Sequence, residues 1–199
     1  MIYIIDYQAG NLRSVQKALE NCGAHVLVTS RPDDLKNADK VIFPGVGAFG
    51  KAKESLEKYG FVEPINEFIK SGKPFLGICL GMQLFFESSE ENPGVSGLSL
   101  FKGVVRRFPR DIKVPHLGWN ELLPIGDNPL WKGIPPGSYF YFAHSFFIEP
   151  LDRSIVVGET DYFGRIAVAI RHNNILGVQF HPEKSQRHGL RVLQNFVDL

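Results

Sequence analysis

The first half of the chain alternates apolar runs with amphipathic segments. Helical spacing is seen at 12–21, which ends before Gly23, and at 49–71, where a break is expected near Gly60 and Pro64. The apolar runs predict short buried strands at 1–6, 25–29, 40–43 and 75–78. Gly10-Asn11 is expected to cap the first helix. Strands and helices that alternate over these lengths are typical of a parallel α/β sheet covered on both faces.

After Glu91 the strands become shorter and turn residues denser. Antiparallel hairpins added to the sheet are predicted at 103–108, 117–123, 138–142, 154–160, 166–171 and 175–180. Asn173-Asn174 signals a tight turn, and a helix is expected at 187–198. The predicted fold is therefore α/β: a mostly parallel, flavodoxin-like central sheet flanked by helices, with antiparallel strands in the C-terminal half. At 199 residues, one domain spanning 1–199 is the first expectation.

Composition narrows the class of protein. The chain is 44% hydrophobic and 22% charged, which is ordinary for a globular protein. A net charge of +1 gives no reason to expect nucleic acid or an anionic membrane as a partner. No apolar run reaches bilayer length and no leader peptide is visible, so a cytoplasmic location is expected. Counting does not exclude a disulfide between Cys22 and Cys79, but a reducing compartment fits better.

Cys79 lies at the most informative position. The strand predicted at 75–78 precedes it, and helical spacing at 80–87 follows it. Gly77 and Gly81 flank it two residues to either side, because a Cβ in so tight a turn would collide with the neighbouring strand or helix. This is the layout of a nucleophile elbow, with cysteine in place of serine. The alternative is a small buried core residue, as many intracellular cysteines are.

A helix N-terminus beside Cys79 would stabilise the thiolate, and the Leu80 N–H could hold an oxyanion. A second donor could come from the Pro44-Gly45-Val46-Gly47 segment, which follows the third predicted strand. By itself this segment also fits a plain turn.

A base is expected at His181, which follows the last predicted strand. In His181-Pro182-Glu183 the proline stiffens the loop, so Glu183 could orient the imidazole. The alternative is a surface His-Pro-Glu turn, which is common. Cys79 and His181 lie about one hundred positions apart, so only the fold could bring them together. The other histidines are expected to be exposed (His25, His172), in the last helix (His188), or core or pocket-lining residues (His116, His144). No metal-ligand spacing, phosphate loop or dinucleotide fingerprint is present, and no cofactor is expected.

The motifs G-I-C-L-G-M-Q and H-P-E together resemble the class I (triad) glutamine amidotransferases. Further stretches are similar to the glutaminase subunits of imidazole glycerol phosphate synthase, so that the resemblance covers nearly the whole chain. They are D-Y-Q-A-G-N-L-R-S-V at 6–15, P-G-V-G-A-F-G at 44–50, G-M-Q-L-F-F-E-S-S-E-E at 81–91, P-H-L-G-W-N-E at 115–121, Y-F-A-H-S-F at 141–146 and F-H-P-E-K-S at 180–185. Gln8 departs from the pattern, which usually has glycine there.

The resemblance implies hydrolysis of L-glutamine to glutamate and ammonia through a γ-glutamyl thioester. It assigns a triad to Cys79, His181 and Glu183, and oxyanion donors to the N–H groups of Val46 and Leu80. Substrate contacts are implied for Gly47, Gln83, Ser145 and Phe146.

The resemblance also implies a partner in a heterodimer, a (β/α)₈ cyclase. The cyclase uses ammonia to convert PRFAR to imidazole glycerol phosphate and AICAR in histidine biosynthesis. Residues implied at that interface are Asn11, Trp119, Tyr141 and Lys184, although core packing is an equal reading for Trp119 and Tyr141.

The flexible Gly45-Val46-Gly47 segment suggests a regulatory hypothesis. Rotation of the Gly45–Val46 peptide would bring the Val46 N–H into the oxyanion hole when the acceptor is bound to the partner. Three rival functions stay open. They are another glutaminase, such as that of pyridoxal phosphate synthesis, a γ-glutamyl hydrolase or cysteine peptidase acting alone, and a non-enzymatic binding module.

Overall fold

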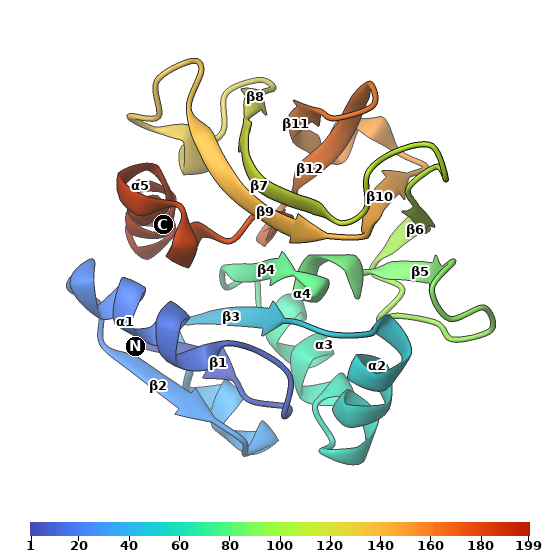
Figure 1. Cartoon of the computed structure of the whole chain (residues 1–199). Helices are drawn as coiled ribbons and strands as arrows, with labels where there is room; N and C mark the ends of the chain where they lie inside the picture. Colours follow the sequence, from blue (N-terminus) through green and yellow to red (C-terminus); the bar gives the residue numbers. More distant parts are fainter.

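Parallel strands form the centre of the protein, whose computed structural model describes all residues from 1 to 199 (Figure 1). They are β1 (Ile2–Ile5), β2 (Val26–Thr29), β3 (Lys40–Gly45), β4 (Phe75–Cys79) and β13 (Ile175–Val178). Their order in the sheet is β2-β1-β3-β4-β13, and each neighbouring pair is parallel. This is the strand order of flavodoxin-like sheets, so the predicted fold class is confirmed.

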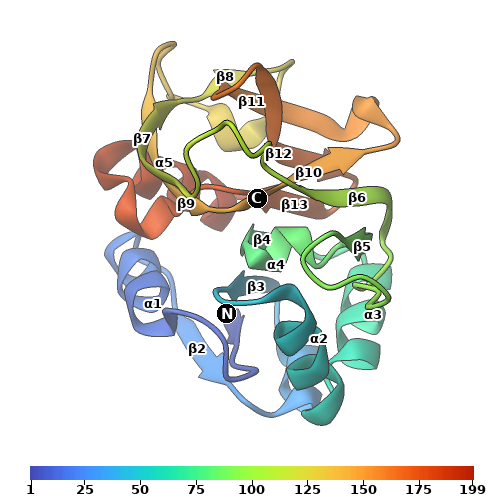
Figure 2. The ribbon, with the colours of Figure 1, turned by 45° about the vertical axis from the view of Figure 1, so that its right-hand side comes forward.

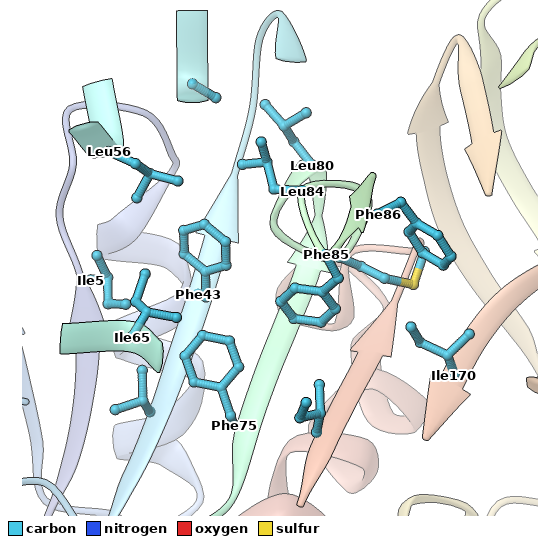
Figure 3. Packing of buried hydrophobic residues seen from close by; sticks show 14 of the residues in the cluster. Ile5, Phe43, Leu56, Ile65, Phe75, Leu80, Leu84, Phe85, Phe86 and Ile170 are labelled. Atoms are coloured by element: carbon cyan, nitrogen blue, oxygen red, sulfur yellow. The ribbon is translucent and has the colours of Figure 1, made fainter. Parts of the chain in front are cut away.

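Helices cover both faces of these strands. The helices α1 (Leu12–Asn21) and α5 (Gln186–Val197) lie on one side, and α2 (Phe49–Lys58) and α3 (Val62–Lys70) on the other (Figure 1). Alternate residues of β1 enter different cores: Ile2 and Ile4 pack on the α1/α5 side, and Tyr3 and Ile5 on the α2/α3 side. Figure 3 shows the second core, in which the rings of Phe43, Phe75 and Phe85 pack against one another and Ile65 lies beside Phe43 and Phe75. Burial on both faces explains why β1, β3, β4 and β13 have no polar alternation.

Antiparallel strands extend the sheet beyond β13. The strand β12 (Arg165–His172) pairs with β13, and the sheet continues through β10 (Phe146–Pro150), β6 (Phe101–Arg107) and β5 (Phe86–Ser89). The strands β11 (Val156–Asp161) and β8 (Leu123–Pro124) branch from β12. A separate antiparallel ribbon consists of β7 (His116–Glu121) and β9 (Tyr139–His144). In both views the ribbon and β10–β12 lie above the half that contains β1–β4 and α1–α3 (Figure 1, Figure 2).

Short 3₁₀ helices complete the chain: η1 (Pro32–Asn37), η2 (Pro129–Trp131), η3 (Arg153–Ile155) and η4 (Pro182–Lys184). The turn predicted between β12 and β13 is present, with Asn173 at φ +52°. None of the helices combines the length and the apolar character needed to cross a membrane. Cys22 and Cys79 are both free thiols.

The prediction of a helix at 80–87 is wrong beyond the first turn, because α4 covers only Leu80–Gln83 and β5 begins at Phe86. Backbone N–H groups of a later segment bind the carbonyl groups that would continue the helix. The Leu98 N–H donates to the Leu84 carbonyl at 2.7 Å, and the Leu100 N–H donates to the Phe85 carbonyl at 2.8 Å. These bonds draw the segment into a parallel pair with β6, which helical spacing in the sequence did not reveal.

Two smaller expectations fail in part, and one strand was missed. The strand β10 was not predicted. Asn11 precedes α1, but its side chain makes no capping hydrogen bond. The break expected near Gly60 is confirmed, with φ +72° at that residue. No break occurs at Pro64, which lies in the first turn of α3, where proline is tolerated because that turn has no intrahelical N–H bond to lose.

Candidate active site

The carboxyl ends of three neighbouring strands meet at Cys79. In the β3–β4 pair Gly45 lies opposite Cys79, and in the β13–β4 pair Val178 lies opposite Ile78. Gln179 therefore follows β13 beside Cys79, and His181 comes two residues later. The pairing of β13 with β4 closes a sequence separation of about one hundred residues. Ligand sites of open α/β sheets lie at such strand ends.

Cys79 forms the expected elbow between β4 and α4. Its backbone has φ +55° and ψ −114°, a conformation that costs a non-glycine residue free energy and is typical of functional turns. A Cβ at Gly81 would lie 1.9 Å from the Phe43 carbonyl oxygen, and a Cβ at Gly77 would lie 2.4 Å from the Phe85 ring. The predicted steric need for both glycines is thus confirmed.

His181 lies against Cys79 in the interior, and Glu183 lies against His181. The Nδ1 atom of His181 is 2.9 Å from Glu183 Oε1, and both side chains are almost inaccessible to solvent. Burial by itself would lower the pKa of His181, but hydrogen bonds to Cys79 and Glu183, together with their charges, raise it to about 10. Since Nδ1 faces Glu183, Nε2 is the nitrogen left for the sulfur. The raised pKa favours a protonated imidazolium at His181.

Two hydrogen bonds to its backbone hold the histidine loop in place. The His181 N–H donates to the Tyr141 carbonyl of β9 at 2.9 Å, and the Ser185 hydroxyl donates to the His181 carbonyl at 2.7 Å. The loop is thus tied both to the ribbon and to the start of α5.

A cavity of about 330 Å³ opens above the cysteine. Most of the predicted site residues line it, as do several residues that the sequence did not single out for this site. The lining is Val46, Gly47, Cys79, Leu80, Gln83, Glu91, Pro115, Ala143, His144, Ser145, Phe146, His181 and Lys184. The structure therefore brings the predicted nucleophile, base, oxyanion segment and substrate-contact residues to one cavity.

The two predicted oxyanion donors come from facing segments. Leu80 begins α4, and its N–H has no intrahelical acceptor. Gly45 packs closely on this turn, because a Cβ there would lie 2.9 Å from the Gly81 nitrogen. Val46 is 43% exposed on the cavity, and Gly47 has φ +98°. The rotation of the Gly45–Val46 peptide stays a hypothesis.

Tyr7 lies behind the Gly45 segment and was not predicted. Its hydroxyl is fully buried, has no hydrogen-bond partner, and is the atom that a Cβ at Gly45 would strike first, at 2.5 Å. Burial, assisted by the nearby charge of Cys79, raises the pKa of Tyr7, so the phenol stays protonated.

Glu91 was also missed as a site residue. Its carboxylate accepts the Phe49 N–H at the start of α2 at 2.8 Å and also lines the cavity. The only signal for Glu91 in the sequence was that it ends the E-S-S-E-E stretch at 87–91, which is part of the family resemblance. It is the one acidic side chain in the cavity wall.

A buried histidine pair supports the opposite wall. The Nδ1 atom of His144 is 2.8 Å from the Phe146 carbonyl oxygen, which can only accept, so His144 carries its proton there. Its Nε2 then accepts from His116 Nδ1 at 3.0 Å. Burial lowers the pKa of His116 to about 4 and that of His144 to about 3, so both are neutral. The expected core or pocket-lining position is found for both, whereas His25 and His172 are exposed as predicted.

Three of the four residues predicted at an interface lie together on the ribbon side. Trp119 pairs with Tyr141 across β7 and β9, and the Lys184 ammonium lies 5.8 Å from the centre of the Tyr141 ring. Trp119 is 46% exposed and Tyr141 is half-buried, so neither is a core residue. Asn11 is exposed at the start of α1. No group of three or more His, Cys, Asp or Glu side chains could hold a metal ion.

Comparison with known proteins places the chain in a family. Residues 3–199 match the family described as glutamine amidotransferase class-I. The chain is 51% identical to a protein of Moorella thermoacetica, covering 100% of this chain and 94% of the relative. It is 50% identical to a protein of Methanothermobacter thermautotrophicus, covering 100% and 98%. Both relatives are named imidazole glycerol phosphate synthase subunit HisH.

Solved structures share the fold at much lower identity. The structure of PurLQS from Thermotoga maritima aligns with a TM-score of 0.80 at 20% identity, covering 99% of this chain and 97% of that one. A crystal structure of a glutamine amidotransferase aligns with a TM-score of 0.78 at 18% identity, covering 100% and 98%. The full-length identity to the curated relatives is far higher, and the chain belongs to the class-I glutamine amidotransferases, among the HisH subunits of imidazole glycerol phosphate synthase.

Proposed function

We propose that this chain hydrolyses L-glutamine at Cys79 and passes the ammonia to a cyclase subunit in histidine biosynthesis. The observation that carries the proposal is the convergence of Cys79, His181 and Glu183 at one buried strand-end site beside the cavity. Full-length similarity to HisH subunits favours this function over a pyridoxal phosphate glutaminase, a lone hydrolase or a binding module.

The mechanism begins with attack of the Cys79 thiolate on the side-chain carboxamide carbon of glutamine. The tetrahedral intermediate collapses when the His181 imidazolium protonates the nitrogen, which leaves as ammonia and yields a γ-glutamyl thioester. Neutral His181 then removes a proton from water, which attacks the thioester and releases glutamate and the thiolate. Glu183 fixes the tautomer throughout and stabilises the imidazolium.

The oxyanion is stabilised by the N–H groups of Leu80 and Val46. Loss of one such donor typically costs 10²–10³ in rate, which makes the Gly45–Val46 peptide an effective control point. The exposed Val46 and the positive φ of Gly47 are consistent with a segment that can reorient.

Substrate recognition uses side chains and backbone groups that line the cavity. The carboxylate of Glu91 is the natural partner for the α-ammonium group of glutamine, since the cavity wall offers no other acid. Gly47, Gln83 and the backbone at Ser145-Phe146 line the same cavity and complete the binding site.

A partner is required because ammonia becomes non-nucleophilic ammonium in neutral water. One face of the β7–β9 ribbon carries three exposed apolar side chains, because alternate residues of a strand point to the same face. Their exposed fractions are 62% for Leu117, 46% for Trp119 and 52% for Tyr139. We assign this face, with Lys184, to contact with a (β/α)₈ cyclase in a heterodimer. The cyclase would use the ammonia to convert PRFAR to imidazole glycerol phosphate and AICAR.

The test compares two nitrogen sources in the reconstituted complex. We expect Cys79→Ala to abolish glutamine-dependent synthesis while ammonium salts still support it, because the variant leaves the cyclase untouched. Loss of both activities would contradict the assigned role. Glutamine hydrolysis measured with and without the acceptor-bound cyclase tests the control point, and equal rates would overturn it.

A further inference from the structure

Gln179 contacts the reacting sulfur and belongs to no part of the triad. Its side chain is fully buried, and its Nε2 atom lies 3.5 Å from Cys79 Sγ. Its backbone N–H donates to the Val168 carbonyl of β12 at 2.8 Å. The sheet therefore fixes the position of this residue on the strand end next to the nucleophile.

The hydrogen-bond network decides which end of the Gln179 amide faces the sulfur. The Phe146 carbonyl oxygen can only accept, so Gln83 must present its NH₂ group there, at 3.1 Å. The same nitrogen of Gln83 is 2.9 Å from Gln179 Oε1, which must therefore be the oxygen. The remaining end of Gln179, its NH₂ group, faces Cys79.

An N–H donor buried beside sulfur stabilises the thiolate more than the neutral thiol or a thioester, because a charged acceptor makes the stronger hydrogen bond. The protein has already ordered this donor, so little reorganisation is needed when negative charge appears on sulfur. It acts whenever sulfur carries that charge, both in the free enzyme and when the thioester releases its thiolate.

We propose that Gln179 is a catalytic residue that donates a hydrogen bond to the Cys79 thiolate and directs it at the cavity. This role deepens the proposed glutaminase function, but it can be tested without that activity because it concerns the state of the sulfur. If Gln179 had a purely structural role, replacing it would affect stability but not the protonation of the sulfur.

The test measures the rate of Cys79 alkylation by iodoacetamide against pH, in a Cys22→Ser background. Gln179→Leu removes the donor at similar size. We expect the midpoint of the alkylation profile to rise by roughly one pH unit, with about tenfold slower alkylation at pH values below it. In the complex with the cyclase, kcat for glutamine should fall roughly 10- to 100-fold, with KM changed less than about threefold.

Asn195→Leu is the matched control. Asn195 is another buried amide, whose nitrogen donates to the Leu130 and Lys132 carbonyls, far from the cysteine in sequence and outside the cavity lining. We expect Asn195→Leu to reduce stability without moving the alkylation midpoint. An unchanged midpoint in Gln179→Leu would overturn the proposal, even if glutamine hydrolysis were impaired.

A second variant covers the case in which the leucine variant fails to fold. Gln179→Met is used for this purpose, because it keeps the length of the side chain but offers no N–H to the sulfur, so the midpoint should rise about as far as in Gln179→Leu. A midpoint equal to that of the parent would again overturn the proposal. Because alkylation needs no substrate, a failure of the glutaminase function would leave this result readable.

Discussion

Gly81 lies directly against the carbonyl oxygen of Phe43, where a Cβ would come within 1.9 Å. The oxygen belongs to the backbone of β3, which packs against the first turn of α4 and cannot move aside without displacing the oxyanion segment. We expect Gly81→Ala to lower the free energy of unfolding by roughly 3 kcal/mol or more, as measured by urea denaturation.

Gly72→Ala serves as the control for Gly81→Ala. Gly72 also has a Cβ-restricted backbone, with φ +78°, but no atom lies within 4 Å of its Cβ position. Gly72→Ala should therefore lower the free energy of unfolding only by the backbone cost of a left-handed alanine, about 1–2 kcal/mol. If both variants lost the same free energy of unfolding, the Phe43 backbone would have to move away from the new Cβ at no cost, which would contradict the prediction.

Tyr7→Phe should not reduce stability, because the hydroxyl that it removes is buried without a partner. An unsatisfied buried hydroxyl costs about 1–3 kcal/mol, so the free energy of unfolding should stay level or rise by roughly 1 kcal/mol. Tyr162→Phe is the comparison, since the Tyr162 hydroxyl donates to the Lys113 carbonyl at 2.7 Å. Thermal or urea unfolding of both variants measures the difference, and a clear loss for Tyr7→Phe would reveal a bond to this hydroxyl.

Acid should destabilise the protein through His116 and His144. Their folded-state pKa values, about 4 and about 3, lie below the usual 6.5, so the unfolded chain binds more protons between these values. The stability contribution is fully present above pH 6.5 and is lost as pH falls through the folded-state values. Each histidine contributes a slope of up to about 1.4 kcal/mol per pH unit in that window.

Urea denaturation of the parent and of His116→Gln from pH 7 to pH 4 measures how much His116 contributes to the dependence of unfolding free energy on pH. We expect the variant to lose less stability than the parent over that range, because one buried titrating group is gone. His25→Gln, at an exposed histidine, should follow the parent curve. Parallel curves for all three proteins would show that the buried pair is not held neutral.

Glu183→Gln should lower kcat for glutamine hydrolysis by roughly 10²–10⁴-fold, because the amide neither holds the imidazolium nor enforces its tautomer. The pKa of His181 should fall from about 10, since the Glu183 charge helps to raise it. Glu183 Oε2 has no hydrogen-bond partner, so an amide nitrogen there displaces no existing bond. Kinetics and an NMR titration of the imidazole measure both effects, with exposed Glu63→Gln as the control. An unchanged titration would remove Glu183 from the triad.

Short-range chemistry explains what the sequence predicted well. The apolar runs of β1, β3 and β4 are recognisable because both faces of each strand are buried. The elbow is recognisable because the steric need for Gly77 and Gly81 concerns positions within two residues of Cys79. His181 and Glu183 are linked by a local loop whose proline restricts the backbone, so their relation is visible from three adjacent residues.

The sequence by itself therefore determined the parallel α/β character, the strained turn at Cys79 and the strand-end positions of the site residues. Only the tertiary structure decided that β13 lies beside β4, which brings Gln179 and His181 to the sulfur. It also decided that α4 ends early against Leu98 and that Glu91 reaches the cavity. These features depend on backbone pairing and packing between distant segments, which leave no periodic signal in the segments themselves.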